Sequence, residues 1–196
     1  MTLIANVNDA NFDKLFGKFL NLKRETIADV YGTVAAIIDQ VRRQGDGALA
    51  KLTKKYDGHT VNLNRLSFTK SEKAELIKLC SKEHLGALEL AANRVRDYHV
   101  RQLPQDSNYV DSYGVTLGYQ WKPIQSIGLY VPGGTASYPS TVLMNAIPAK
   151  IAGVQRIAMV VPTPDGCVNP LVLAAAEIAR VDEIYRVGGA QAIAAL

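Results

Sequence analysis

The amino-acid sequence predicts an α/β protein in which N-terminal helices precede incomplete Rossmann-like parallel-sheet units. Before Pro104, apolar residues recur with a helical period, whereas from Ile127 onward β-branched runs alternate with helix-forming runs. This alternation within one continuous stretch implies parallel strands joined by right-handed crossovers. Two of the strand-like runs stop at a glycine pair, at residues 133–134 and 188–189.

Four helices are expected in the N-terminal part, all of them as scaffold. The first is an amphipathic core helix followed by glycines at 45 and 47, because apolar residues recur at spacings of three and four: Ile27, Val30, Val34, Ile37 and Val41. A second helix is expected over residues 48–56, ending at Asp57-Gly58, and a third opens at Ser71. The fourth stops before Pro104 and has a stripe made of Leu88, Ala91, Val95 and Tyr98.

The pattern changes after residue 104. Residues 109–113 and 115–121 are rich in aromatic and β-branched side chains and flank Gly114, which predicts a twisted hairpin. Beyond the first glycine pair, residues 141–153 are helical despite Pro148, and residues 157–161 form a buried strand. Asn169 caps a helix that begins at Pro170, and the next strand covers residues 183–187.

Composition excludes several classes of protein. The 196 residues are 48% hydrophobic and 20% charged, as in a soluble globular protein, and the net charge of +4 comes from lysines and arginines interspersed with acids. That mixing argues against a nucleic-acid partner. No signal peptide or membrane-spanning stretch is recognisable, and Cys80 and Cys167 form no CxxC motif, so we expect no membrane association and a cytoplasmic protein.

The glycine pairs have two interpretations. Each pair either closes a tight βα loop or lets the backbone approach a ligand at the carboxyl ends of parallel strands. Neither the G-x-G-x-x-G fingerprint nor a phosphate loop ending in Gly-Lys-Ser or Gly-Lys-Thr occurs. Tyr130 and Gln191 favour the ligand interpretation, because a phenol and a carboxamide at such turns suit a flat, hydrogen-bonding ligand.

No catalytic or metal-ligating residue can be assigned from spacing. His59, His84 and His99 are too dispersed for a metal motif, and Cys80 shares a helix face with His84 without further ligands nearby. A G-x-S-x-G nucleophile elbow is missing as well.

Three segments resemble one known family. The run GLYVPGGTASYPSTVLMNAIPAK at residues 128–150 closely resembles the signature region of histidinol dehydrogenases. Residues 187–196 resemble a second segment of that family, and residues 42–49 resemble its N-terminal portion. The resemblance covers nearly the whole chain.

The resemblance implies an NAD-dependent zinc alcohol dehydrogenase that oxidises L-histidinol to L-histidine through an aldehyde, the last step of histidine biosynthesis. It implies that Tyr130 and Gln191 contact NAD, that Tyr56 approaches the cofactor, and that the complete enzyme is a homodimer. It also divides the chain into an N-terminal helical arm (1–22), part of a first α/β domain (23–132) and a truncated second Rossmann-like domain (133–196).

The family continues for about as many residues again, and that part carries the zinc ligands and a glutamate–histidine pair for acid/base chemistry. The chain by itself is therefore expected to be inactive. Two alternatives remain: a noncatalytic α/β fragment that binds only nucleotide or a partner chain, and a related zinc and NAD alcohol dehydrogenase with another substrate.

Overall fold

The computed structural model describes residues 6–133 and 138–196, with the side chains of residues 21–29 excepted. Gly134 of the first glycine pair and the Ile27 side chain lie outside the described part. Within it, helices precede a three-stranded parallel sheet, which confirms the predicted α/β class.

From residue 6 onward, the described N-terminal part contains four α-helices and one 3₁₀ turn. These are α1 (Phe12–Gln44), α2 (Asp46–Asp57), η1 (Leu63–Arg65), α3 (Lys70–Ile77) and α4 (Lys82–Val100). Helix α2 ends at Asp57 and Gly58, as the sequence predicted, and Gly58 adopts the left-handed conformation. The cap of α3 is Thr69 and not Ser71, because the Thr69 hydroxyl accepts from Glu72 N while the Glu72 carboxylate accepts from Thr69 N.

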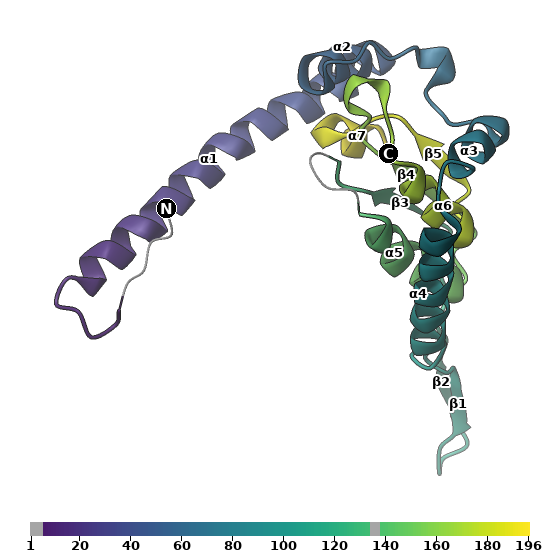
Figure 1. The fold of residues 1–196 in the computed structure, drawn as a ribbon. Coiled ribbons are helices and arrows are strands. Elements are labelled where there is room, and N and C mark those ends of the chain that lie inside the picture. Colours follow the sequence, from purple (N-terminus) through teal and green to yellow (C-terminus); the bar gives the residue numbers. More distant parts are fainter. Residues whose placement is uncertain (1–5, 134–137) are drawn as a thin grey trace.

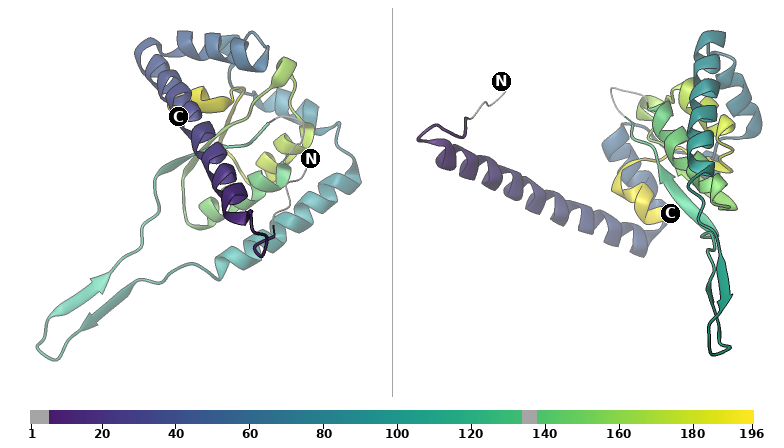
Figure 2. Two further views of the ribbon diagram at one scale, coloured as in Figure 1. Left: turned by 90° about the vertical axis from the view of Figure 1, so that its left-hand side faces the viewer. Right: turned by 90° about the horizontal axis from the view of Figure 1, so that it is seen from below.

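Helix α1 projects from the body as a long arm (Figures 1 and 2). Among its described side chains, Ile37 and Val41 near the C-terminal end are buried against α2 and α7, whereas Val30 is 55% exposed. The prediction that Val30 belongs to a core stripe is therefore wrong for this chain. The spacing of the apolar residues correctly predicts a helix, but Val30 lies on a turn of α1 that precedes the turns packed against the body. The helix also runs unbroken through residues 22 and 23, and the predicted domain boundary there stays a prediction.

Helix α4 differs from the prediction by one position. Leu88 and Ala92 are buried, whereas Ala91 is exposed and Tyr98 is 63% exposed. Packing against α5 and α6 decides which side of this helix faces inward, and the local spacing alone left that choice open.

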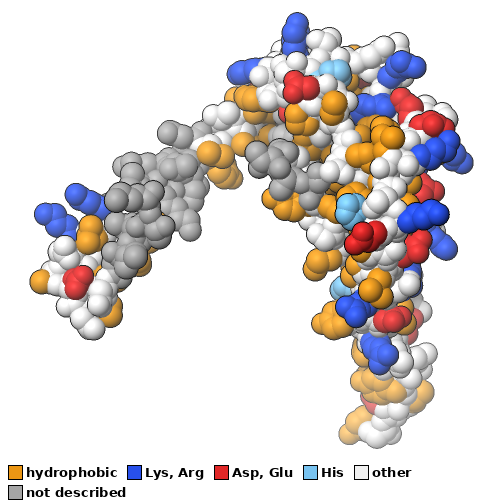
Figure 3. All heavy atoms as spheres, in the orientation of Figure 1, with side chains coloured by type: hydrophobic (Ala, Val, Ile, Leu, Met, Phe, Trp, Pro, Cys, Tyr) orange, Lys and Arg blue, Asp and Glu red, His pale blue; other side chains and the backbone are white. Residues whose placement is uncertain are grey.

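The predicted hairpin consists of β1 (Ser107–Val110) and β2 (Thr116–Tyr119), which pair antiparallel around Gly114. It projects from the body beyond the end of α4, in a different direction from α1 (Figure 2). One face of the hairpin carries four side chains that are each between 42% and 61% exposed: Tyr109, Leu117, Tyr119 and Trp121. Hydrophobic side chains gather there in Figure 3, whereas acids and bases are interspersed along α3 and α4.

The sheet contains β3 (Ser126–Tyr130), β4 (Arg156–Val160) and β5 (Glu183–Tyr185), all parallel and in that order. Helix α5 (Pro139–Ile151) joins the first two strands and tolerates Pro148 near its end. The 3₁₀ turn η2 (Pro164–Gly166) and α6 (Pro170–Ile178) join the next two, with Asn169 accepting from Leu171 N as the predicted cap. The predicted boundary between the two α/β domains, at residues 132 and 133, falls between β3 and β4. These two strands are hydrogen-bonded neighbours in one sheet.

The two faces of this sheet are covered differently. Ile157, Met159 and Ile184 point into a core shared with α4, α5 and α6. On the opposite face, Leu49 of α2 packs with Val160, and α7 (Gly189–Ala195) lies beside it.

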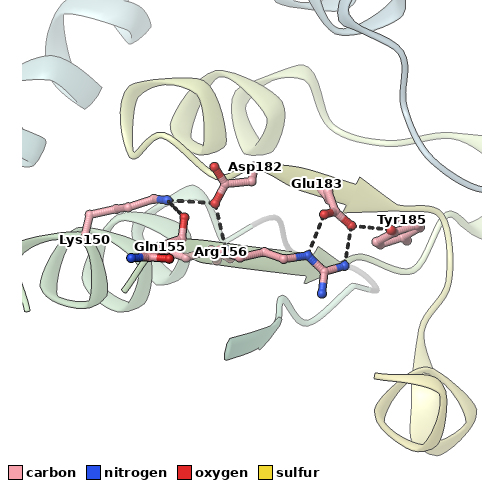
Figure 4. A network of polar contacts seen from close by, with 7 residues as sticks. Lys150, Gln155, Arg156, Asp182, Glu183 and Tyr185 are labelled. Carbon is pink, nitrogen blue, oxygen red and sulfur yellow. Dashed lines mark hydrogen bonds and ion pairs between the residues drawn. The ribbon is translucent and has the colours of Figure 1, made fainter. Parts of the chain in front are cut away.

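The amino ends of the strands are joined by ion pairs, drawn in Figure 4. Lys150 Nζ lies 2.7 Å from Asp182 Oδ2, which also accepts from Ile157 N. Arg156 donates two hydrogen bonds to the Glu183 carboxylate, at 2.7 and 2.9 Å. The carboxyl ends of the strands, where the glycine pairs lie, are thus the opposite edge of the sheet.

Candidate functional site

The loops that follow the three strands meet at Pro162. A Cβ atom added at Gly133, after β3, would lie 2.9 Å from the Pro162 ring, and one added at Gly188, after β5, would overlap that ring. Both positions therefore require glycine because the backbone approaches a neighbouring loop. This packing supports the loop-closing interpretation of the glycine pairs, and it also brings both turns to one place.

Tyr130 connects the two turns directly. Its hydroxyl, at the end of β3, accepts a hydrogen bond from Gly189 N at 3.3 Å. Gly189 has a φ of +68°, a conformation that side chains disfavour. The structure thus places Tyr130 within hydrogen-bond distance of the turn that carries Gln191.

Gln191 lies in the first turn of α7 and is only 1% exposed. Its amide nitrogen Nε2 has no hydrogen-bond partner among the described residues. The side chain folds back toward its own turn. A Cβ atom added at Gly189 would lie only 2.5 Å from Gln191 Oε1. An unpaired buried amide is costly, and such groups in native proteins normally meet water or a ligand.

Arg186 anchors the segment that leads into the second turn. Its Nη1 donates to the carbonyl oxygens of Arg65 and Ser67, at 2.7 and 3.0 Å, and its Nη2 lies 2.9 Å from Glu72 Oε1. The guanidinium also lies over the Phe68 ring, 3.6 Å from its centre. Bonds from Thr69 and the Arg186 charge lower the pKa of Glu72. The second turn is therefore held by a residue whose planar fork no lysine reproduces.

Helix α2 lies along the same edge. Tyr56 is 48% exposed, with the Lys55 ammonium 5.0 Å from its ring centre. Asp57 follows it, and burial raises the pKa of the Asp57 carboxyl while the nearby His59 opposes that change. Sequence reasoning did not single out Asp57, Pro162 or Thr163. The only available signal was that Pro162 directly follows a buried strand.

In the described part of the chain, no group of three or more His, Cys, Asp or Glu side chains lies close enough together to hold a metal ion. His59 lies next to Gly166 of the loop after β4. Within the same residues, no helix combines the length and the apolar character needed to cross a membrane.

Comparison with known proteins gives a consistent result. The family model described as "Histidinol dehydrogenase" matches residues 20–196. The chain belongs to the histidinol dehydrogenase family. A histidinol dehydrogenase of Rhizobium meliloti (strain 1021) is 53% identical over 196 residues, which cover 100% of this chain and 45% of that relative.

Two further relatives agree with this family assignment. A histidinol dehydrogenase of Bradyrhizobium diazoefficiens is 54% identical over 189 residues, covering 96% of this chain and 44% of the relative. A crystal structure of histidinol dehydrogenase from Elizabethkingia anophelis superposes with a TM-score of 0.80 at 32% identity, covering 85% of this chain and 38% of that chain. The chain thus spans less than half the length of the histidinol dehydrogenases that it matches.

Proposed function

We propose that this chain provides the NAD-binding portion of a histidinol dehydrogenase, with Tyr130 and Gln191 as cofactor contacts. The observation that carries the proposal is the convergence of both glycine turns at Pro162, with the Tyr130 hydroxyl at one turn and an unpartnered carboxamide at the other. A phenol and a free amide donor suit the polar groups of a dinucleotide. Bound NAD would supply the hydride acceptor, with one NAD molecule consumed for the oxidation of the alcohol and a second for the oxidation of the aldehyde.

The reaction we propose for the complete enzyme is the two-step oxidation of L-histidinol to L-histidine in histidine biosynthesis. The names of the relatives support this substrate. We propose zinc as the metal of the complete enzyme, and we assign no ligand or acid/base residue in this chain. We expect no histidinol oxidation by the 196-residue chain alone.

For the complete enzyme we also propose a homodimer in the cytoplasm. The exposed apolar face of the hairpin supports an interface between copies, because contiguous aromatic and aliphatic side chains of this kind mark association surfaces. The two free cysteines, Cys80 and Cys167, suit a reducing compartment.

The cofactor contacts are tested by NAD titration of the 196-residue chain, followed calorimetrically. Tyr130→Ala and Gln191→Ala should each raise the dissociation constant about fivefold, since each lost contact costs about 1 kcal/mol. Tyr113→Ala and Gln120→Ala, on the distant hairpin, are matched controls and should bind as the unmodified chain does. Equal affinity of all four variants would return the glycine turns to a purely structural role.

Activity is tested by joining the chain to the remaining part of the Rhizobium meliloti relative and following NADH formation. Histidinol should then be oxidised, and the Tyr130→Ala and Gln191→Ala forms should show a larger increase in KM for NAD than for histidinol. Oxidation of other polar alcohols in preference to histidinol would contradict the proposed substrate.

A further inference from the structure

Four buried side-chain atoms in the described part of the chain lack a hydrogen-bond partner, and all four belong to segments around the candidate site. They are Thr53 Oγ1, Asp57 Oδ2, Thr163 Oγ1 and Gln191 Nε2. Three of these residues were not singled out by the sequence. Buried polar groups in native proteins are nearly always paired, so a concentration of unpaired ones in one region points to a missing partner.

Two of the four lie on one face of α2. Leu49, Thr53 and Asp57 follow each other at intervals of four residues, which places them in one row along the helix. Leu49 packs with Val187 and Ala192, just before and within the helix that carries Gln191. The α2 row therefore faces the start of α7.

The end of α2 reaches the loop that carries Thr163. A Cβ atom added at Gly58 would lie 3.8 Å from Asp165 Oδ1, and one added at Gly166 would lie 2.9 Å from His59 Cε1. Gly166 N in turn donates to Thr163 O. Helix α2, the loop after β4 and the first turn of α7 thus enclose one seam at the carboxyl edge of the sheet.

The chemistry of the four atoms is complementary to a hydroxyl-bearing ligand. Gln191 Nε2 is a donor, the Asp57 carboxylate oxygen is an acceptor, and the two threonine hydroxyls can serve as either. Adjacent sugar hydroxyls donate to a carboxylate and accept from an amide at the same time. The seam offers both functions from different segments.

We propose that the seam between α2, the Thr163 loop and α7 binds a ribose of the dinucleotide, with Asp57 accepting from its hydroxyls. This inference rests on the proposed NAD binding and extends the site from Tyr130 and Gln191 to Thr53, Asp57 and Thr163. The four atoms are shielded from solvent, so binding as proposed requires α2 and α7 to separate. Satisfying the four unpaired atoms favours the bound form.

The sharpest test uses Thr53→Val and Thr163→Val, which keep the side-chain shape and remove the hydroxyl. An unpaired hydroxyl contributes no bond to the ligand-free fold, so the melting temperature should stay unchanged or rise. The dissociation constant for NAD should increase about threefold to tenfold in each variant, because a ligand contact is lost. A purely structural role of the two hydroxyls would not combine weaker NAD binding with an unchanged or raised melting temperature.

Two controls keep the result interpretable. Thr69→Val removes a hydroxyl that caps α3 and should lower the melting temperature without changing the NAD affinity. Thr53→Ser keeps the hydroxyl and should bind NAD nearly as the unmodified chain does. A drop in melting temperature with unchanged affinity for both seam variants would mean that buried water fills the seam, and the proposal would fail.

Asp57→Asn and an NAD analogue lacking ribose 2′-hydroxyls provide the second test. The unmodified chain should prefer NAD over the analogue, and Asp57→Asn should reduce that preference by about threefold to tenfold. If the chain binds NAD and Tyr130→Ala weakens binding, but Asp57→Asn leaves the preference intact, only the ribose assignment fails. If the unmodified chain binds no NAD, both the assignment and the proposed function fail for this chain.

Discussion

The two faces of the three-stranded sheet are built on opposite principles. The face toward α5 and α6 is dry, with Ile157, Met159 and Ile184 at most 1% exposed. The face toward α2 and α7 carries Arg156, Glu183 and Tyr185 and borders a cavity of about 320 Å³ lined in part by Gly128 and Leu196. The first face supplies stability through packing, whereas the second combines polar groups with open space.

The difference extends to the carboxyl edge. Tyr130 and Val187 belong to the cluster on the α2 and α7 side, and the four unpartnered polar atoms lie on segments around that edge. Pairing requirements are met less completely there than in the core beneath α5 and α6. Function is commonly located where such local rules are broken and the rest of the fold compensates.

The largest loss of stability is expected from truncating a buried side chain on the face toward α5 and α6. Leu173→Ala removes a fully buried side chain of α6 and leaves a cavity, which should lower the free energy of unfolding by about 3 kcal/mol. Leu196→Ala, on a side chain that is 50% exposed beside the open face, should cost less than about 0.5 kcal/mol. Denaturant unfolding of both variants measures the contrast, and equal losses would mean that the open face is packed as tightly as the dry one.

A smaller loss is expected at Arg186, which ties β5 to the segment before α3. Arg186→Met keeps much of the apolar stem but leaves three acceptors without their donor, and should cost about 2 kcal/mol. Arg186→Lys should recover only part of this, since an ammonium cannot reach all three acceptors in one plane. Full recovery with lysine would show that charge alone, and not the fork geometry, holds this edge of the sheet.

Local patterns predicted much of the fold because their causes are local. Gly58 ends α2 through its own backbone, and Asn169 caps the helix begun by Pro170 whatever surrounds it. The inward side of α4 and the departure of α1 from the body depend on which elements pack there, and the spacing of Ala91 and Val30 holds no such information.

The candidate site divides in the same way. Tyr130 and Gln191 stand next to glycine pairs that are visible in the sequence, and the resemblance to a family identified them. Pro162 and Thr163 belong to the site because three loops that are distant in the sequence meet there in the folded chain. Asp57 reads as an ordinary acidic residue at a helix end until its carboxylate oxygen is found buried without a partner.

The smallest effect is expected from the ion pair on the open face. Two hydrogen bonds from Arg156, and a third from the Tyr185 hydroxyl, lower the pKa of Glu183 from 4.5 to about 2. The unfolded chain, with the ordinary pKa, takes up the proton first as the pH falls. The stabilisation is therefore complete above about pH 4.5 and is lost as the pH falls toward about 2.

Glu183→Gln should accordingly lower stability near neutral pH and flatten its decline in acid, by a modest amount because the Arg156 side chain is 57% exposed. Unfolding at a series of pH values measures the slope. Glu177→Gln, which removes a 64% exposed carboxylate paired with Lys73, is the matched control and should leave the slope much closer to that of the unmodified chain. Identical slopes for both variants would mean that solvent screens the open face completely, and its ion pair would then contribute nothing to the contrast between the two faces.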